Sequence, residues 1–177
     1  MIELQLQILN FIQTYIRHPI LDHIMRFITS LGNFGIIWLM IGIILIMKKH
    51  YKSAFILFLA LMIGVMICNG LLKNLFQMPR PFEFNSSIEL LIPKPLDYSF
   101  PSGHTGSSFA AFYVLFLRKE KSWQFSLVFA ILMAFSRMYL YVHFPMDIIG
   151  GIIVGMLSAK LSVYLFNFLC QKRFLND

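Results

Sequence analysis

The sequence predicts an all-α integral membrane protein, a bundle of five transmembrane helices preceded by an amphipathic N-terminal helix. Hydrophobic residues make up 58% of the 177 residues and charged residues only 13%, a balance outside the range of soluble domains. The apolar residues also gather in runs of about 20, the length of a helix that crosses a bilayer. The chain length suits one domain, residues 1–177.

Residues 1–26 predict an interfacial helix and a short segment that leads into the bundle. Glutamine, asparagine and glutamate interrupt the apolar side chains of residues 1–19, and from Ile8 onward the apolar spacing is roughly helical. This mixture is too polar to cross a bilayer and favours a helix that lies in the interface. The stretch also lacks a basic start and a small-residue cleavage site, so we expect no cleavable signal peptide.

Five apolar runs follow, and each is expected to form a span. Between the second and third runs, prolines and small polar residues predict a loop over residues 77–99, with room for a short helix. A proline at the start of the third run suits the first turn of a helix. The expected spans cover about residues 27–47, 53–72, 101–117, 123–141 and 145–169.

Basic residues predict the orientation of the bundle. Strongly basic segments close the first, third and fifth runs, at residues 48–52, 118–121 and 171–173. Short basic loops mark the cytoplasmic side of a membrane, so the N-terminus and the 77–99 loop are expected on the other side. The net charge of +7 follows from this topology. The sequence has no basic run with interleaved aromatic residues, and we expect no nucleic-acid partner.

Three polar stretches lie at the ends of the apolar runs: KNLFQMPRP at residues 73–81, PSGH at 101–104 and SRMYLYVHFPMD at 136–147. Polar and charged groups beside membrane spans are costly and are usually retained for function. The predicted topology brings all three stretches to the same face. We therefore expect one extracytoplasmic site in the cell membrane, at the level of the lipid headgroups.

The cations in these stretches are suited to holding a phosphate. Lys73, Arg80 and Arg137 supply positive charge, and the two arginines can bind phosphate oxygens in bidentate fashion. Ser102 and Gly103 lie where the third helix is expected to begin, and free N–H groups at a helix start favour anions. Any one of these cations could be a membrane anchor, but the set together indicates phosphate binding.

The two histidines can divide a two-step hydrolysis between them. We expect His143 to be the nucleophile that forms a phosphohistidine, and His104 to be the general acid and base. Asp147, four residues after His143, can accept from one ring nitrogen and leave the other free to attack. Asp147 could also serve only as a helix cap. The cations and the helix start neutralise the phosphate in this scheme, so we expect neither a metal nor a cofactor.

Together the three stretches resemble the signature of the type 2 phosphatidic acid phosphatase family. The resemblance runs from Lys73 to Asp147, and the predicted spans on either side agree with the family's helical fold. Many membrane members have six spans, whereas five are counted here, and the difference is one N-terminal span. The signature positions that are filled, in order, are Lys73, Arg80, Pro81, Pro101, Ser102, Gly103, His104, Ser136, Arg137, His143 and Asp147.

The resemblance implies metal-independent hydrolysis of a membrane lipid phosphate or pyrophosphate, with His143 as the phosphorylated residue. Small bacterial members act on undecaprenyl pyrophosphate, phosphatidylglycerophosphate or phosphatidic acid. The signature recognises the phosphate and not the rest of the lipid, so the particular lipid stays open, as does the oligomeric state. The predicted spans argue against the soluble acid phosphatases and vanadium haloperoxidases of the same family. The alternative function is a catalytically silent protein that binds or transports lipid phosphates.

Overall fold

The computed structural model describes residues 2–85 and 87–174, and every regular element within them is a helix. The predicted all-α class is therefore confirmed for this part of the chain. The α-helices are α1 (Ile2–Phe11), α2 (Pro19–Leu31), α3 (Ile36–Met47), α4 (Tyr51–Val65), α5 (Lys73–Phe76), α6 (Pro81–Phe84), α7 (Gly103–Leu117), α8 (Trp123–Tyr139) and α9 (Pro145–Phe174). Two π-helical segments, η1 (Ile12–Ile16) and η3 (Met66–Leu72), and a 3₁₀ segment, η2 (Asn33–Gly35), complete the fold.

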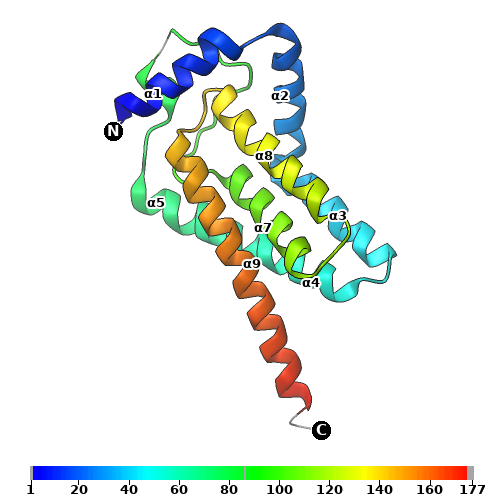
Figure 1. The fold of residues 1–177 in the computed structure, drawn as a ribbon. Coiled ribbons are helices and arrows are strands. Elements are labelled where there is room, and N and C mark those ends of the chain that lie inside the picture. The colour runs from blue at the N-terminus through cyan, green and yellow to red at the C-terminus, as the bar shows by residue number, and fades with distance from the viewer. Residues whose placement is uncertain (1, 86, 175–177) are drawn as a thin grey trace.

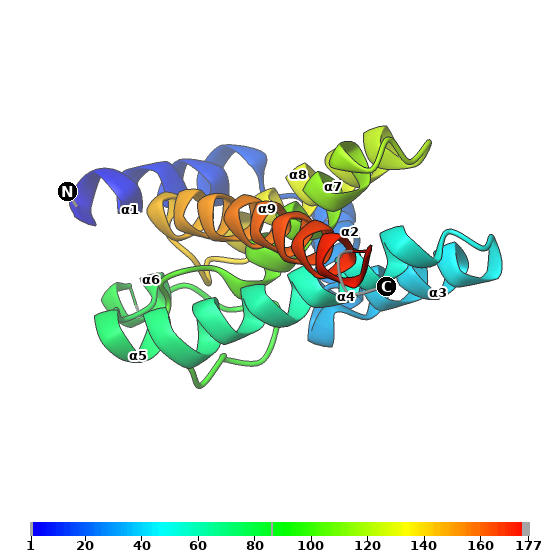
Figure 2. The same cartoon turned by 90° about the horizontal axis from the view of Figure 1, so that it is seen from below.

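The centre of the bundle is formed by α4, α7 and α9, each of which packs against the other two. Figure 2 shows α9 lying between α4 and α7. Leu57, Val114 and Ala159, one from each of these helices, are fully buried in a single apolar cluster. Trp38 of α3 joins the same cluster, and its indole N–H donates to the hydroxyl of Ser108 on α7 at 3.2 Å.

Glycines allow α7 and α9 to approach closely. Gly151 and Gly155 are four residues apart on α9 and share one face, a spacing typical of close helix contacts in membranes. A Cβ added at Gly155 would lie 2.3 Å from the backbone oxygen of Gly106, and one at Gly151 would lie 2.7 Å from that of Ser102. This approach brings the starts of α7 and α9 together, where the Ser102 N–H donates to the backbone oxygen of Asp147 at 3.0 Å.

The N-terminal helix α1 lies across one end of the bundle (Figure 1). The Gln5 side chain accepts from the N–H of Met146 at 3.0 Å, and Asn10 accepts from the hydroxyl of Tyr141 at 2.7 Å. Helix α1 therefore covers the turn between α8 and α9. Its placement in a membrane interface stays a prediction, and it does expose large apolar side chains: Ile2, Leu4, Ile8 and Phe11.

The first predicted span, residues 27–47, is not one helix. Helix α2 begins earlier, at Pro19, and the chain bends by 54° between α2 and α3. The bend lies at residues 32–35, where Phe34 and Gly35 have φ angles of 53° and 68°, outside the range of a right-handed helix. The run expected to form the first span is thus a bent pair of helices, because hydropathy alone does not register a local break. Whether the pair forms one span stays a prediction.

The other helices lie close to their expected positions. Those that begin at Gly103, Trp123 and Pro145 start within two residues of the expected starts. Helix α4 continues through η3 into α5, so the second helical run ends at Phe76. The loop that follows contains α6 as its short helix.

Two described segments are long and apolar enough to cross a membrane, Tyr51–Phe84 and Pro145–Gln171, and the bent pair α2–α3 would make a third if it forms one span. Helices α7 and α8 have 15 and 17 residues. At a rise of about 1.5 Å per residue they are shorter than the roughly 30 Å hydrocarbon core. The arrangement with five spans therefore stays a prediction.

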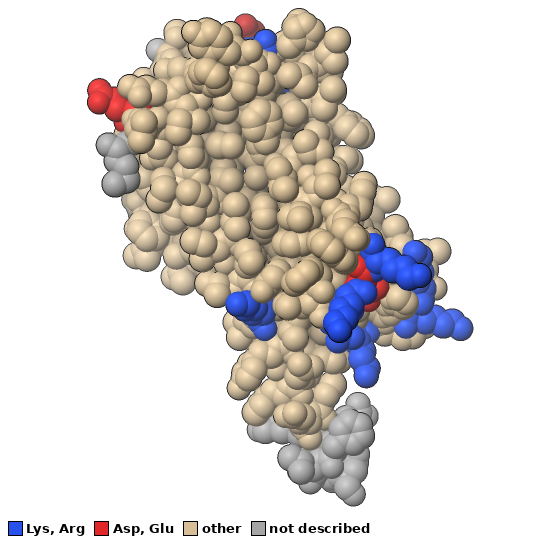
Figure 3. Space-filling model, in the orientation of Figure 1, with Lys and Arg blue, Asp and Glu red and all other residues tan. Residues whose placement is uncertain are grey.

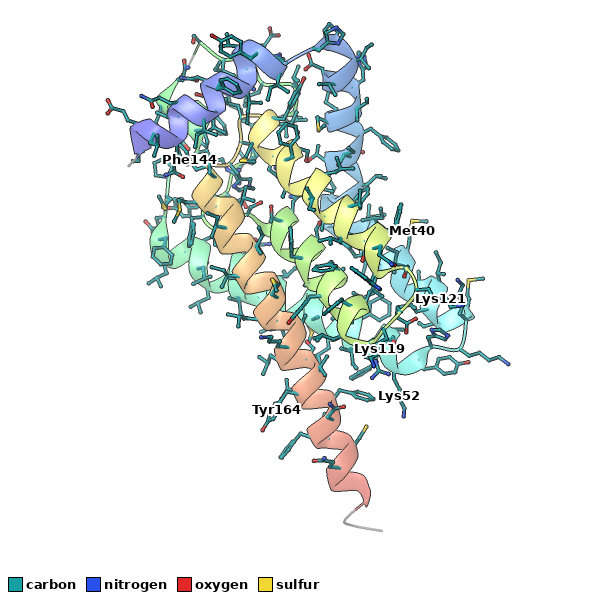
Figure 4. The ribbon with its side chains drawn as sticks, in the orientation of Figure 1. Met40, Lys52, Lys119, Lys121, Phe144 and Tyr164 are labelled. Carbon is teal, nitrogen blue, oxygen red and sulfur yellow. The ribbon has the colours of Figure 1, made fainter. Side chains whose placement is uncertain are left out.

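Lysine and arginine side chains gather at the end of the bundle that lies away from α1 (Figure 3). Figure 4 labels Lys52, Lys119 and Lys121 there, in or beside the turns that join α3 to α4 and α7 to α8. Phe144 is labelled at the opposite end, next to α1. The fold thus separates the basic turns from the turn between α8 and α9, as the predicted orientation requires.

Candidate active site

A cavity of about 1040 Å³ holds most of the predicted site residues. Its wall combines polar side chains from several loops and helix ends with apolar side chains of α3 and α4. Ser102 and Asp147 are fully buried behind the wall. The predicted residues that line the cavity are Lys73, Arg80, Gly103, His104, Arg137 and His143.

A tight turn between α8 and α9 places His143. Tyr141, with φ at 59°, reverses the chain after α8, and His143 is only 1% exposed. The ring Nδ1 lies 3.2 Å from Oδ2 of Asp147. Because an ionised carboxylate can only accept, Nδ1 carries the proton and Nε2 is unprotonated, with its lone pair available as an acceptor.

The Asp147 carboxylate acts as helix cap and as histidine partner at once. It lies in the first turn of α9, and its Oδ2 accepts from the N–H of Phe144 at 2.8 Å as well as from His143. The hydroxyl of Ser99 donates to the same oxygen. Oδ1 is buried and has no hydrogen-bond partner among the described residues. The two roles that the sequence left open for Asp147 are therefore compatible.

Burial lowers the pKa of His143 well below its ordinary value of 6.5, and the nearby positive charges of Arg80, Arg137 and Lys73 lower it further. The imidazole is therefore neutral at neutral pH. A neutral ring with its proton on Nδ1 presents an unprotonated Nε2, which is the form that a nucleophile needs.

Arg80 is buried and contacts His143 directly. Its Nη1 donates to the backbone oxygen of Val142 at 2.8 Å and lies 3.2 Å from Nε2 of His143. Its Nη2 donates to Oδ1 of Asp97 at 2.7 Å and to the backbone oxygen of Tyr98 at 3.3 Å. Its Nε donates to the backbone oxygen of Asp97 at 2.8 Å. These five contacts match the five N–H donors of a guanidinium.

Lys73 shares the Asp97 carboxylate with Arg80. Lys73 is buried at the start of α5, and its Nζ donates to Oδ2 of Asp97, a side chain that is 53% exposed. Partial burial raises the pKa of Asp97, but the hydrogen bonds and charges of Lys73 and Arg80 outweigh this effect and hold the pKa below its ordinary value. Asp97 is therefore an ionised carboxylate bound to two of the three predicted phosphate-binding cations.

Arg137 reaches the cavity from the end of α8. Its Nη1 donates to the hydroxyl of Thr29 on α2. Its Nε is buried and has no hydrogen-bond partner within the described part of the chain. A buried donor without an acceptor costs about 1–3 kcal/mol, and a phosphate oxygen in the cavity is the kind of acceptor that would offset this cost.

His104 lies in the first turn of α7 and faces the break between α2 and α3. Its Nε2 lies 3.1 Å from the side-chain oxygen of Asn33. A Cβ on Gly32 would lie 2.6 Å from Cδ2 of the same ring, so the imidazole packs directly on this glycine. The bend that interrupts the first apolar run therefore forms part of the site.

Ser102 and Gly103 occupy different positions relative to the cavity. The Ser102 hydroxyl accepts from the N–H of Thr105 at 3.4 Å, and its own N–H donates to the Asp147 backbone. Ser102 thus caps α7 and ties it to α9 behind the cavity wall. Gly103 begins α7 and lines the cavity, and the first N–H groups of a helix have no acceptor within it. Of the two residues, Gly103 is the better placed to meet an anion.

Sequence reasoning missed four polar residues that contact the predicted ones. Asp97 and Ser99 lie a few positions before the PSGH stretch, and polar residues so close to a motif are a signal that could have found them. Thr29 and Asn33 lie far from the three stretches in sequence. Only the folded arrangement of α2 and its break brings them to the site.

The predicted residues bring three cations, a neutral imidazole and a second histidine to one cavity. Among the described residues, no group of three or more His, Cys, Asp or Glu could hold a metal ion. Positive charge at the cavity comes from Lys73, Arg80 and Arg137, and Arg26 and Lys94 also line it. Such a set can bind a phosphate and stabilise charge on its oxygens while Nε2 of His143 attacks phosphorus.

Comparisons with known proteins agree on one family. The sequence model of the PAP2 superfamily matches residues 53–170. The undecaprenyl-diphosphatase of Sulfolobus acidocaldarius is 32% identical over 145 residues, 81% of this chain and 69% of the relative. The crystal structure of Aquifex aeolicus LpxE has a TM-score of 0.79 and 30% identity, covering 91% of this chain and 95% of that one. A transmembrane PAP2 type phosphatidylglycerolphosphate phosphatase from Bacillus subtilis has a TM-score of 0.71 and 26% identity, covering 97% and 87%.

Proposed function

The chain belongs to the PAP2 superfamily, and on that premise we propose that it hydrolyses a membrane lipid phosphate or pyrophosphate through a phosphohistidine on His143. The observation that carries this proposal is the environment of the His143 ring. Asp147 holds Nδ1, while Nε2 lies beside Arg80 at the wall of a cation-lined cavity. A histidine held in this way is oriented for attack on a bound phosphate.

The first step transfers the phosphoryl group to the enzyme. Nε2 of His143 forms a bond to phosphorus as the bond from phosphorus to the leaving oxygen breaks. His104 gives its proton to that oxygen, so the lipid product leaves as an alcohol, or as a monophosphate when the substrate is a pyrophosphate. The negative charge of a bound phosphate favours the protonated form of His104 that this step needs.

The second step returns the enzyme to its starting state. His104, now neutral, takes a proton from a water molecule as the water oxygen attacks phosphorus. The bond between phosphorus and Nε2 breaks, and inorganic phosphate is released. The Asp147 carboxylate stabilises the cationic phosphorylated ring between the two steps, and Lys73, Arg80 and Arg137 hold the phosphate oxygens.

The cavity also offers a path for a lipid tail. One part of its wall is apolar and comes from α3 and α4, with the side chains of Leu39, Phe58, Leu61, Met62 and Val65. An apolar extension of a phosphate site suits a substrate whose tail stays in the bilayer. An isoprenoid pyrophosphate such as undecaprenyl pyrophosphate is our first candidate, and phosphatidylglycerophosphate or phosphatidic acid follows.

We place the site at the extracytoplasmic face of the cell membrane. The support is the charge distribution, because the basic turns lie at the opposite end of the bundle from Phe144, the neighbour of His143 (Figure 4). Basic turns favour the cytoplasmic side. The site then meets lipids of the outer leaflet at headgroup level.

Phosphate release by the purified protein in detergent tests the proposed function. The panel is undecaprenyl pyrophosphate, phosphatidylglycerophosphate and phosphatidic acid, each with the wild type and His143→Ala, in the presence of a chelator. We expect release from at least one lipid that is lost in the variant and insensitive to the chelator. Tight binding of all three lipids without release from any would favour a catalytically silent binding protein instead.

A further inference from the structure

The Asp97 carboxylate bridges two of the cations that are predicted to bind phosphate, Lys73 and Arg80. Its Oδ2 contacts Nζ of Lys73 and its Oδ1 contacts Nη2 of Arg80. Each carboxylate oxygen thus takes a donor from a different predicted phosphate-binding cation. A phosphate with two oxygens on the same side could make the same pair of contacts.

Counting donors shows that a phosphate has to compete with Asp97 for Arg80. Three of the five N–H donors of Arg80 point at backbone oxygens of residues 97, 98 and 142, which the loops hold in place. The other two point at Oδ1 of Asp97 and Nε2 of His143. A phosphate can therefore gain Arg80 only by replacing the two side-chain contacts. Losing the His143 contact also frees the nitrogen that attacks.

The contact that Asp97 makes with the two cations can break easily. It lies in the loop that precedes α7 and its side chain is 53% exposed, so the carboxylate can turn into water without being buried elsewhere. Asp147, the other carboxylate of the site, is fully buried in the first turn of α9 and accepts from the Phe144 N–H there. The low pKa of Asp97 keeps it ionised, and therefore ready to rebind the cations, across the neutral range.

We propose that Asp97 is an internal counter-anion. It positions Lys73 and Arg80 in the empty site, and the phosphate group of the substrate replaces it as their partner. This inference rests on the proposed function. It assigns Asp97 a role in both binding and release. By rebinding the two cations, Asp97 weakens the hold of the site on every phosphate, including the inorganic phosphate that must leave after each turnover.

Asp97→Asn tests this role because it removes the charge and keeps the size of the side chain. Inorganic phosphate is titrated against the purified protein, and the rise in thermal midpoint gives its Kd. Asparagine competes less well for the two cations, so we expect a Kd about three- to thirtyfold lower than that of the wild type. The change is modest because the Asp97 side chain is 53% exposed in both ion pairs. In turnover, KM and the inhibition constant of phosphate should fall together while kcat does not rise.

Two matched variants complete the experiment. Glu89→Gln removes an exposed carboxylate from the same loop and should leave the Kd for phosphate unchanged. Asp97→Glu restores a carboxylate and should return the Kd towards the wild-type value. If phosphate binds to Asp97→Asn no more tightly than to the wild type, the inference is overturned. If neither the wild type nor Asp97→Asn binds phosphate, the proposed function fails instead.

Discussion

Replacing Asp147 with asparagine tests whether the carboxylate acts through its charge or only through its shape. An amide oxygen in the place of Oδ2 can still accept from the Phe144 N–H, the Ser99 hydroxyl and Nδ1 of His143. The amide NH₂ then falls at the position of Oδ1, which is buried and has no partner among the described residues. The variant therefore keeps the contacts, loses the charge and buries a donor.

The size of each effect follows from these contacts. Hydrogen bonds to charged groups contribute about 1.5–3 kcal/mol and neutral ones about 0.5–1.5 kcal/mol, so the bond to His143 weakens by roughly 1–1.5 kcal/mol. At about 1.4 kcal/mol per tenfold in rate, this alone slows phosphoryl transfer about tenfold. The ring becomes cationic when Nε2 binds phosphorus, which raises the expected loss in kcat to about a hundredfold. The buried donor should also reduce stability by about 1–3 kcal/mol.

The assay measures kcat by phosphate release and stability by thermal midpoint in the same detergent. Ser99→Ala is the matched control, because it removes one donor to the same oxygen and leaves the charge in place. We expect this control to lower kcat by less than about fivefold. If Asp147→Asn keeps kcat within about twofold of the wild type while its stability falls, Asp147 is only a helix cap and the reasoning is refuted.

Two other predictions concern the packing of α7 on α9 and the protonation of the nucleophile. Gly155→Ala places a methyl group 2.3 Å from a backbone oxygen of α7 and should destabilise the protein by about 1–3 kcal/mol, measured as a lower thermal midpoint. Gly70→Ala is the control, because its Cβ meets nothing within 4 Å. Equal midpoints for the two variants would contradict the close packing of α7 on α9. Because burial and neighbouring cations lower the pKa of His143 below 6.5, the ring stays unprotonated as pH falls to that value. The acidic limb of kcat/KM should then lie below pH 6.5, and half-loss at or above pH 6.5 in the free enzyme contradicts this assignment.

The sequence was most informative where charge and hydropathy act locally. Helices beginning at Gly103, Trp123 and Pro145 follow from apolar runs bounded by basic turns or prolines. The break at residues 32–35 does not, because glycine and asparagine within an apolar run barely change its hydropathy. The contacts of this bend are tertiary, since Gly32 and Asn33 lie against His104 of α7.

The site residues also divide into those that the local sequence indicates and those that only the fold brings together. Three motifs identified Lys73, Arg80, Arg137 and both histidines, because cations and imidazoles beside apolar runs are conspicuous. Asp97 was not found, although it lies four residues before Pro101; nearness to the motif marks it as a candidate, but only the fold shows which cations it contacts. The position of Ser102 behind the cavity wall was also not predictable, because it depends on the glycine-mediated approach of α7 and α9.

The measurement that tests the central claim most directly is capture of the covalent intermediate. A substrate labelled with ³²P on its terminal phosphate is mixed with the purified protein, the reaction is stopped rapidly with denaturant, and label on the protein is counted. We predict label at His143 of the wild type and none on His143→Ala. Any label transferred to His104→Ala should persist, since hydrolysis of the phosphohistidine then lacks its base. Label that persists in His143→Ala, or normal turnover in that variant, would contradict the phosphohistidine mechanism.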